Sequence, residues 1–367
     1  MAFDKVVDSS ELDAGLLQIA NAIREKGGTS GRLPFPKGMA DAITAIEVGG
    51  GSGGGGTEKE DAIIEKTLTE YTNDRIKTIG EYLFRSCGSL TSVNFPAATT
   101  IGNSAFYNCT SLTSVNFPAA TTIGNSAFYN CTSLTSVNFP VVKTIGDSAF
   151  YSCYGLTSVI FPAATTIGSC AFYDCEKLKS VDLPAATSIC NSTFANCSKL
   201  TSINFPLVTS IGTNAFKGCS SLTSVNFPLV TTISTTAFNG CSRVTSVNFP
   251  AATTIGNSAF CSCYGLTSVI FPAATTIGTS AFYNCEKLTS VNFPAATTIG
   301  SYAFRSCYSL AEVHLMGSSL CALAHSNAFS GAINSTKGSI FVPASLLTDY
   351  QSATNWAYFS TRFVAGD

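Results

Sequence analysis

The chain repeats one phrase, Leu112-Thr-Ser-Val115-Asn-Phe117-Pro118-Ala-Ala-Thr-Thr-Ile123-Gly124-Asn-Ser-Ala127-Phe128-Tyr-Asn-Cys131-Thr-Ser, and the next copy opens at Leu134. The period of 22 residues holds without a slip across residues 89–310. A strict period of this length indicates a solenoid, because each copy can bury its apolar face only against its neighbours. One proline marks the same point of every copy: Pro96, Pro118, Pro140, Pro162, Pro184, Pro206, Pro228, Pro250, Pro272 and Pro294.

The first part of each copy has the polarity pattern of a short strand. Val115 and Phe117 alternate with Ser114 and Asn116, which predicts that the apolar pair points inward and the polar pair outward. Pro118 follows directly and ends the strand, because proline has no backbone donor for a sheet.

The second part of each copy returns the chain to the next strand. Residues 125–128 indicate a turn that enters a short helical or 3₁₀ segment, with Ala127, Phe128 and Cys131 pointing inward. One strand and one return segment per copy, stacked in parallel, match the leucine-rich-repeat pattern. The sequence therefore predicts an α/β repeat solenoid.

The repeat pattern Leu-x-x-Val-x-Phe-Pro, then Ile-Gly-x-x-Ala-Phe-x-x-Cys-x-x-Leu, resembles the BspA-like leucine-rich repeats found in many bacterial surface proteins. The resemblance covers about two thirds of the chain. It implies a right-handed, curved solenoid with the parallel sheet on the concave side, and a role in binding instead of catalysis.

The composition divides the chain into five parts. A short helical pattern precedes a run of glycines, and cap-like segments flank the repeats. Glycine runs of this kind act as flexible tethers. We assign residues 1–47 to a small helical docking module, 48–57 to a linker, 58–88 to an N-terminal cap with a first half-repeat, 89–315 to the solenoid and 316–367 to a C-terminal cap.

The N-terminal module carries a second resemblance. Its phrases Val-Asp-Ser-Ser-Glu-Leu-Asp at 7–13 and Leu-Pro-Phe-Pro-Lys-Gly-Met-Ala-Asp-Ala-Ile at 33–43 are similar to a module of virion proteins in phages and prophages of Gram-positive bacteria. Two short helices make a very small core. We therefore expect residues 1–47 to dock on a virion protein or another structural subunit, and a homo-oligomer stays open.

Charge and hydropathy argue against two classes of partner. Only 11% of residues are charged and the net charge is −2, so no basic stripe for nucleic acid is expected. No apolar run reaches the roughly 20 residues of a membrane span. The opening residues also lack the apolar core of a secretory signal. We expect cytoplasmic assembly into a virion tail, with the bacterial cell surface as the alternative location.

The sequence contains no recognisable catalytic or metal-binding arrangement, so we expect no cofactor, no metal site and no enzyme activity. There is no Cys-x-x-Cys pair, and His314 and His325 have no set of further ligands around them. Most of the 15 cysteines occupy one inward repeat position, where a small apolar side chain suffices. They are Cys87, Cys109, Cys131, Cys153, Cys175, Cys197, Cys219, Cys241, Cys263, Cys285 and Cys307.

The candidate binding residues form two rows. Outward strand positions make a neutral row that can hydrogen-bond a glycan or a polar protein face, although a plain solvated sheet with stacked amides has the same pattern. Tyrosines of the return segment make a second row, suited either to contacts or to packing between coils. The first row is Asn94, Asn116, Asn138, Ile160, Asp182, Asn204, Asn226, Asn248, Ile270 and Asn292, and the second is Tyr107, Tyr129, Tyr151, Tyr173 and Tyr283.

These observations lead to one functional expectation and one alternative. The first is a tail-associated or receptor-binding phage protein that contacts a protein or glycan of the bacterial host surface through its repeats. The alternative is a BspA-like adhesin of the bacterial cell surface. Neither requires bond-making chemistry.

Overall fold

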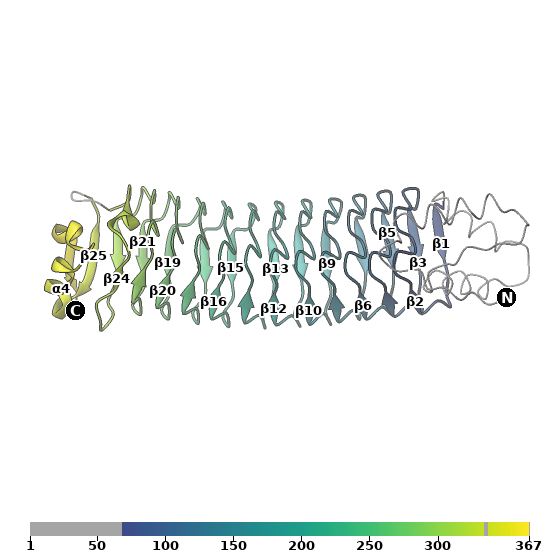
Figure 1. Cartoon of the computed structure of the whole chain (residues 1–367), viewed down its shortest axis with the longest axis horizontal. Coiled ribbons are helices and arrows are strands. Elements are labelled where there is room, and N and C mark those ends of the chain that lie inside the picture. Colours follow the sequence, from purple (N-terminus) through teal and green to yellow (C-terminus); the bar gives the residue numbers. More distant parts are fainter. Residues whose placement is uncertain (1–67, 334–336, 367) are drawn as a thin grey trace, which may run out of the picture. The chain divides into compact units, whose positions relative to one another are not determined.

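A computed structural model describes residues 68–333 and 337–366. They fall into two compact units, one ending at Leu156 and one beginning at Thr157. In each unit short parallel strands stack coil upon coil (Figure 1). The helical docking module expected at 1–47 and the linker expected at 48–57 lie outside the described residues and stay predictions.

Each coil of the first unit carries a three-residue strand and a two-residue strand. Pairing is parallel and joins identical repeat positions, as in Ser92 with Ser114 and Thr100 with Thr122. Like residues therefore stack in rows. The strands are β1 (Glu70–Thr72), β2 (Thr78–Ile79), β3 (Ser92–Asn94), β4 (Thr100–Ile101), β5 (Ser114–Asn116), β6 (Thr122–Ile123), β7 (Ser136–Asn138) and β8 (Thr144–Ile145).

The second unit repeats this arrangement. Its long strands form three sheets, β9-β11-β13, β15-β17 and β19-β21-β23-β25-β26, and its short strands run from β12 to β24 in one sheet. The strands are β9 (Ser158–Ile160), β10 (Thr166–Ile167), β11 (Ser180–Asp182), β12 (Ser188–Ile189), β13 (Ser202–Asn204), β14 (Ser210–Ile211), β15 (Ser224–Asn226), β16 (Thr232–Ile233), β17 (Ser246–Asn248), β18 (Thr254–Ile255), β19 (Ser268–Ile270), β20 (Thr276–Ile277), β21 (Ser290–Asn292), β22 (Thr298–Ile299), β23 (Glu312–His314), β24 (Ala322–Leu323), β25 (Ser339–Pro343) and β26 (Phe363–Gly366).

The predicted inward positions are confirmed. Val115 and Phe117 of the strand and Ala127, Phe128 and Cys131 of the return segment are all buried. Burying a large apolar side chain stabilises the fold by about 1.5–3 kcal/mol. Since every coil repeats this set, each coil adds a similar increment and depends on its neighbours for it.

Two columns of phenylalanine rings run through the core. In the first unit Phe106 stacks on Phe128 with ring centroids 5.2 Å apart, and Phe95 stacks on Phe117 at 5.4 Å. Rings of the two columns also meet edge to face, as Phe106 and Phe117 do at 5.9 Å. Offset stacks and edge contacts are the favoured aromatic geometries, so the columns fill the core without strain.

The return segment is not helical, so this part of the α/β prediction is wrong. Its backbone amides alternate between a partner in the next coil and a partner in their own coil. The Phe128 N–H donates to the Ala149 carbonyl of the next coil at 2.8 Å, whereas the Tyr129 N–H donates to the Ser126 carbonyl of the same coil at 3.1 Å. Ser126 and Asn130 have φ of 53° and 56°, in the left-handed region. A helix needs right-handed residues and donors that stay within the segment, and neither condition holds.

A glycine allows the coils to approach closely at one corner. A Cβ on Gly124 would lie 2.7 Å from the Asn103 backbone nitrogen, and Gly124 N–H donates to the Ile101 carbonyl at 2.8 Å. Cys190 and Ser234 hold the same repeat position in the second unit.

The first described coil is more complete than the half-repeat assigned from sequence. Residues 68–88 carry both β1 and β2, and β1 pairs in register with β3. Tyr71 of β1 stacks on Phe95 with ring centroids 5.4 Å apart. The tyrosine thus covers the end of one phenylalanine column.

The repeat also continues past residue 315, where the sequence pattern decays. Strand β24 pairs with β22, and Phe329 stacks on Phe304 at 5.3 Å. Because Phe329 follows Phe304 by 25 residues instead of 22, this coil is longer than the others and its periodicity is hidden.

A compact cap packs on this last coil. The Trp356 Nε1–H donates to the Cys321 carbonyl at 2.6 Å, and the Tyr350 hydroxyl accepts the Cys321 N–H at 2.9 Å. The Trp356 ring contacts Phe329 at 5.9 Å and so covers the phenylalanine column. The helical elements are η2 (Ser326–Phe329), η3 (Ala344–Leu346), α4 (Leu347–Ser352) and η4 (Ala357–Arg362). None of the helices among residues 68–333 and 337–366 is long and apolar enough to cross a membrane.

Removing one ring from a column should weaken the first unit strongly. We expect Phe128→Ala to lower the free energy of unfolding by about 3–5 kcal/mol, because it leaves a cavity between two stacked neighbours. Urea denaturation followed by circular dichroism measures the change. Val141→Ala is the control, since Val141 is 42% exposed and should cost less than about 0.5 kcal/mol. Equal effects of the two variants would contradict the stacked-column account.

Candidate functional site

The first candidate row lies on the outer face of the long strands, as predicted. None of its ten residues is buried. Parallel pairing sets Asn94 beside Asn116 and Asn116 beside Asn138 in the first unit. In the second unit it sets Asp182 beside Asn204. We call this surface the long-strand face.

The amides of this row bond to one another. The Asn116 Nδ2 donates to the Asn94 Oδ1 at 2.7 Å, and the Asn138 Nδ2 donates to the Asn116 Oδ1 at 2.9 Å. A primary amide has two donor hydrogens and two acceptor lone pairs. Each side chain therefore keeps hydrogen-bonding capacity for solvent or a ligand, while the row itself stabilises the sheet.

The row changes character in the second unit. Asn204 donates to Asp182 at 2.8 Å and Asn248 donates to Asn226 at 2.7 Å. Ile270 cannot continue such a row, and its side chain is 62% exposed. Among the described residues no bond joins Asn226 to Asn204, so the second unit has two separate bonded pairs, and an apolar side chain follows Asn248.

The long strands of the second unit are unpaired at two places, because β13 and β15, and likewise β17 and β19, belong to different sheets. A groove of about 470 Å³ lies between β17 and β19. This groove was not expected from the sequence, although Ile270 within a row of asparagines was a signal for an irregularity. The groove is lined by Thr245, Ser246, Val247, Asn248, Pro250, Thr267, Ser268, Ile270 and Pro272.

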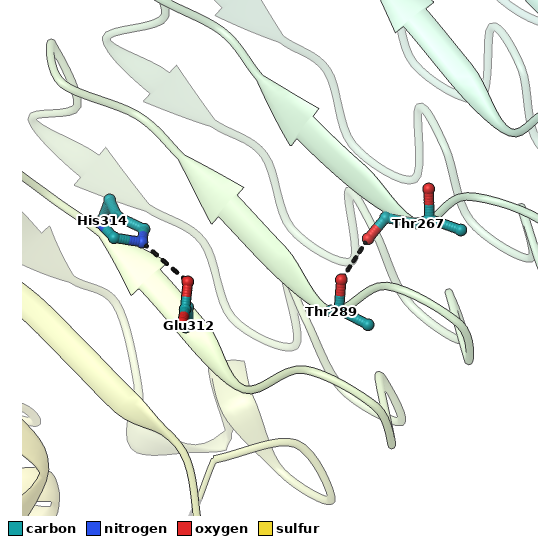
Figure 2. A network of polar contacts seen from close by, with 4 residues as sticks. All are labelled: Thr267, Thr289, Glu312 and His314. Atoms are coloured by element: carbon teal, nitrogen blue, oxygen red, sulfur yellow. Dashed lines mark hydrogen bonds and ion pairs between the residues drawn. The ribbon is translucent and has the colours of Figure 1, made fainter.

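Beyond the groove the outward row becomes aromatic. Figure 2 shows the His314 ring turned toward Glu312, with Nε2 and Oε2 3.3 Å apart. The same figure shows a hydrogen bond between coils, in which the Thr289 hydroxyl donates to the Thr267 carbonyl of the preceding coil at 2.9 Å. His314 also stacks on Phe341 with ring centroids 4.5 Å apart. The outward row of the second unit therefore changes along its length: it begins with bonded polar side chains, includes the exposed Ile270, and ends with the stacked rings of His314 and Phe341.

The tyrosine row packs between coils in the first unit. Tyr107 stacks on Tyr129, and Tyr129 on Tyr151, with ring centroids 4.7 Å apart in both pairs. The Arg85 guanidinium lies 4.9 Å from the Tyr107 ring. Tyr173 and Tyr283 of the second unit are half-buried. Since the ring faces meet one another, mainly edges and hydroxyls are left for contacts.

The repeated cysteines have a structural role. The Cys131 thiol donates to the Phe106 carbonyl of the preceding coil at 3.1 Å, and that carbonyl also accepts the Cys109 N–H at 3.2 Å. Burial raises the pKa of Cys131, and likewise that of Cys241, to about 12. Cys131 and Cys241 form no disulfide and stay protonated near neutral pH, so both are poor nucleophiles and poor metal ligands.

The described part of the chain shows no cluster of His, Cys, Asp and Glu that could hold a metal ion. Of the two histidines, His314 pairs with Glu312 and the His325 Nδ1 accepts the Asn327 N–H at 3.0 Å. Both lie in the last coils of the second unit.

Comparison with known families and structures gives a consistent result. The family described as BspA type Leucine rich repeat region matches in six copies over residues 68–166, 121–244 and 231–351. No curated protein matches the chain.

Three solved structures illustrate the similarity. A leucine-rich repeat protein from Bacteroides ovatus is 25% identical over 82% of this chain and 92% of its own, with a TM-score of 0.54. A leucine rich cell surface protein from Faecalibacterium prausnitzii is 27% identical over the same shares, 82% and 92%, with a TM-score of 0.45. A leucine-rich repeat protein from T. pallidum is 33% identical over 42% of this chain and 72% of its own, with a TM-score of 0.38.

The amide ladder should contribute measurably to stability. We expect Asn116→Ala to lower the free energy of unfolding by about 1–2 kcal/mol, because it breaks two side-chain hydrogen bonds, each of which contributes about 0.5–1.5 kcal/mol. Denaturant titration measures the loss. Ser114→Ala on the same strand is the matched control and should change little, and a similar loss there would remove the support for the ladder.

The repeated thiols should be unreactive in the folded chain. With a pKa near 12 for Cys131 and Cys241, only about one thiol in ten thousand is ionised at pH 8. At pH 8 an aromatic disulfide reagent should react in the folded protein only with the half-buried Cys170, Cys190 and Cys261. After denaturation it should react with all 15 cysteines. Raising the pH toward 12 should increase the reaction of the buried thiols. Rapid labelling of Cys131 in the native protein, mapped by mass spectrometry, would show that its environment is wrong.

Proposed function

Because the chain belongs to the BspA-type leucine-rich-repeat family, we propose that it is a non-enzymatic binding protein that holds a macromolecule against its long-strand face. One observation carries the proposal. The outward row is polar, almost uncharged and only partly engaged, as the Asn116 and Asn138 amides show. Such a surface can form many hydrogen bonds to a ligand without having to desolvate charges.

The repeats suit adhesion better than chemistry. Each coil presents the same kind of side chain at the same position, so weak contacts add along the row and a multivalent partner gains avidity. Burial raises the pKa of the Cys131 thiol, and the described residues contain no cluster that could hold a metal ion. We infer attachment to other surfaces as the role, with a glycan or a polar protein face as the partner.

We propose the bacterial cell surface as the place of action, since BspA-type repeats are typical of surface proteins. The phage-tail role is the second candidate, and it rests on the phrases at 7–13 and 33–43. In that case residues 1–47 would dock on a virion protein or another structural subunit. The same long-strand face would then contact the bacterial host.

Localisation separates the two candidates. We expect protease added to intact cells of the producing organism to remove the repeats, and mass spectrometry of purified phage particles from the same culture to find none of this chain. The control is a cytoplasmic enzyme, which must survive the protease. If the repeats resist protease on intact cells and the chain is recovered from phage particles, the phage-tail role would replace the cell-surface role.

Binding is tested with the full chain. We expect labelled protein to be retained on immobilised surface polysaccharides or glycoproteins, and retention to fall by roughly tenfold, or about 1.4 kcal/mol, when Asn138, Asn204 and Asn226 are all changed to alanine. Circular dichroism of the variant checks that the fold persists. Absence of retention on every surface would remove the proposed function, whereas retention unchanged in the variant would move the contact away from the amides.

A further inference from the structure

We propose that the groove between β17 and β19 is a subsite for an uncharged carbohydrate. The inference rests on the proposed binding function and adds the ligand class and the place of contact. It is carried by four observations: unpaired backbone groups, the composition of the lining, the groove's dimensions and the end of the amide ladder.

Backbone hydrogen bonds that join other coils are missing at the groove. In neighbouring coils Thr245 N–H donates to Thr223 and Thr289 N–H donates to Thr267, both at 2.8 Å, but within the described chain no such bond joins Thr267 to Thr245. On the other side of the strand, Phe227 N–H donates to Asn248 at 3.0 Å.

The equivalent bond from Phe249 to Ile270 is also missing from the described chain. The Phe249 residue is buried, and leaving a buried amide without a partner costs about 1–3 kcal/mol. Phe249 does not line the groove, whereas Thr267, whose N–H lacks the bond to Thr245, does. A ligand hydroxyl, or water in its place, can accept a hydrogen bond from the Thr267 N–H.

The lining matches a neutral sugar. Hydroxyl groups come from Thr245, Ser246 and Ser268, and apolar surface comes from Ile270 and Pro272. Sugars combine hydroxyl groups on their edges with apolar C–H faces, so both kinds of surface are used. None of the residues that line the groove is charged, and nothing there would compensate the charge of an acidic glycan or a phosphate.

The dimensions favour a small ring over an inserted peptide strand. A volume of about 470 Å³ lies within the usual range of ligand sites, about 300–1,000 Å³. Insertion of a strand would require the coils to separate to roughly 9.6 Å, twice the normal strand spacing. The Phe249 and Phe271 rings beneath are only 6.1 Å apart, and β18 and β20 remain paired.

The groove coincides with the end of the amide ladder. Asn248 donates to Asn226, but Ile270 beyond it cannot donate to the Asn248 Oδ1. An asparagine at position 270 would bring a second amide to that oxygen and continue the row toward Asn292, which pairs with Ile270. The isoleucine thus leaves the Asn248 Oδ1 available as an acceptor at the groove.

The test uses the full chain on an array of uncharged oligosaccharides, printed beside their sialylated and sulfated counterparts and a set of extended peptides. We expect selective binding of one or more uncharged oligosaccharides. Ser268→Trp, which fills the groove, should lower the affinity for the best of them by at least about tenfold, equivalent to about 1.4 kcal/mol. Ser180→Trp is the matched control, because Ser180 occupies the same repeat position on β11, which is paired on both sides and adjoins neither strand of the groove. The affinity of this variant should stay within about twofold.

A second pair of variants tests the ladder argument. Ile270→Asn should weaken binding by bridging the row, whereas Ile270→Val should preserve it. Melting curves confirm folding for all four variants. Selective binding of acidic glycans or peptides, or equal loss in Ser268→Trp and Ser180→Trp, would overturn the inference. If the array is silent while the chain still attaches to surfaces, the groove inference fails and the proposed function stands; if neither binds, both fail.

Discussion

The structure depends on the fixed spacing of parallel coils. Backbone pairing joins the same repeat position of adjacent coils, as in Val93 with Val115, so a paired residue lies about 4.8 Å from its counterpart, which is usually of the same kind. Only side chains that tolerate their own kind at this distance can occupy such a row. Phenylalanine rings stack, amides bond to amides, and thiols donate to carbonyls of the neighbouring coil.

This constraint also explains the low charge of the chain. Like charges directly opposite each other across paired strands destabilise a sheet, and a repeated lysine or glutamate would place them so in every coil. The 11% charged residues are therefore a consequence of the architecture. They also shape the function, because the resulting surface recognises partners through hydrogen bonds and apolar contacts.

The places where the rows break carry the specific information. A uniform row binds any partner of suitable chemistry equally well along its length, whereas an exception creates a distinct point. Ile270 ends the run of amides and faces solvent, and the sheet opens beside it between β17 and β19. Specificity in such a molecule is expected at these exceptions, with the regular coils serving as scaffold and as a source of avidity.

The sequence alone determined the coil, its register and its inward positions. A period of 22 residues with Val115, Phe117, Phe128 and Cys131 at fixed points leaves only one way to bury those side chains. It also placed the asparagine row on the outer face, because residues alternate between the two faces of a strand. The tertiary structure decided what depends on contacts between coils. The return segment became a series of turns because alternate amides bind the next coil, and the last coil stayed hidden because its length differs. Long-strand pairing is lost between β13 and β15 and between β17 and β19, and a groove lies at the second place. The spacing between coils is not encoded in the polarity of any one repeat.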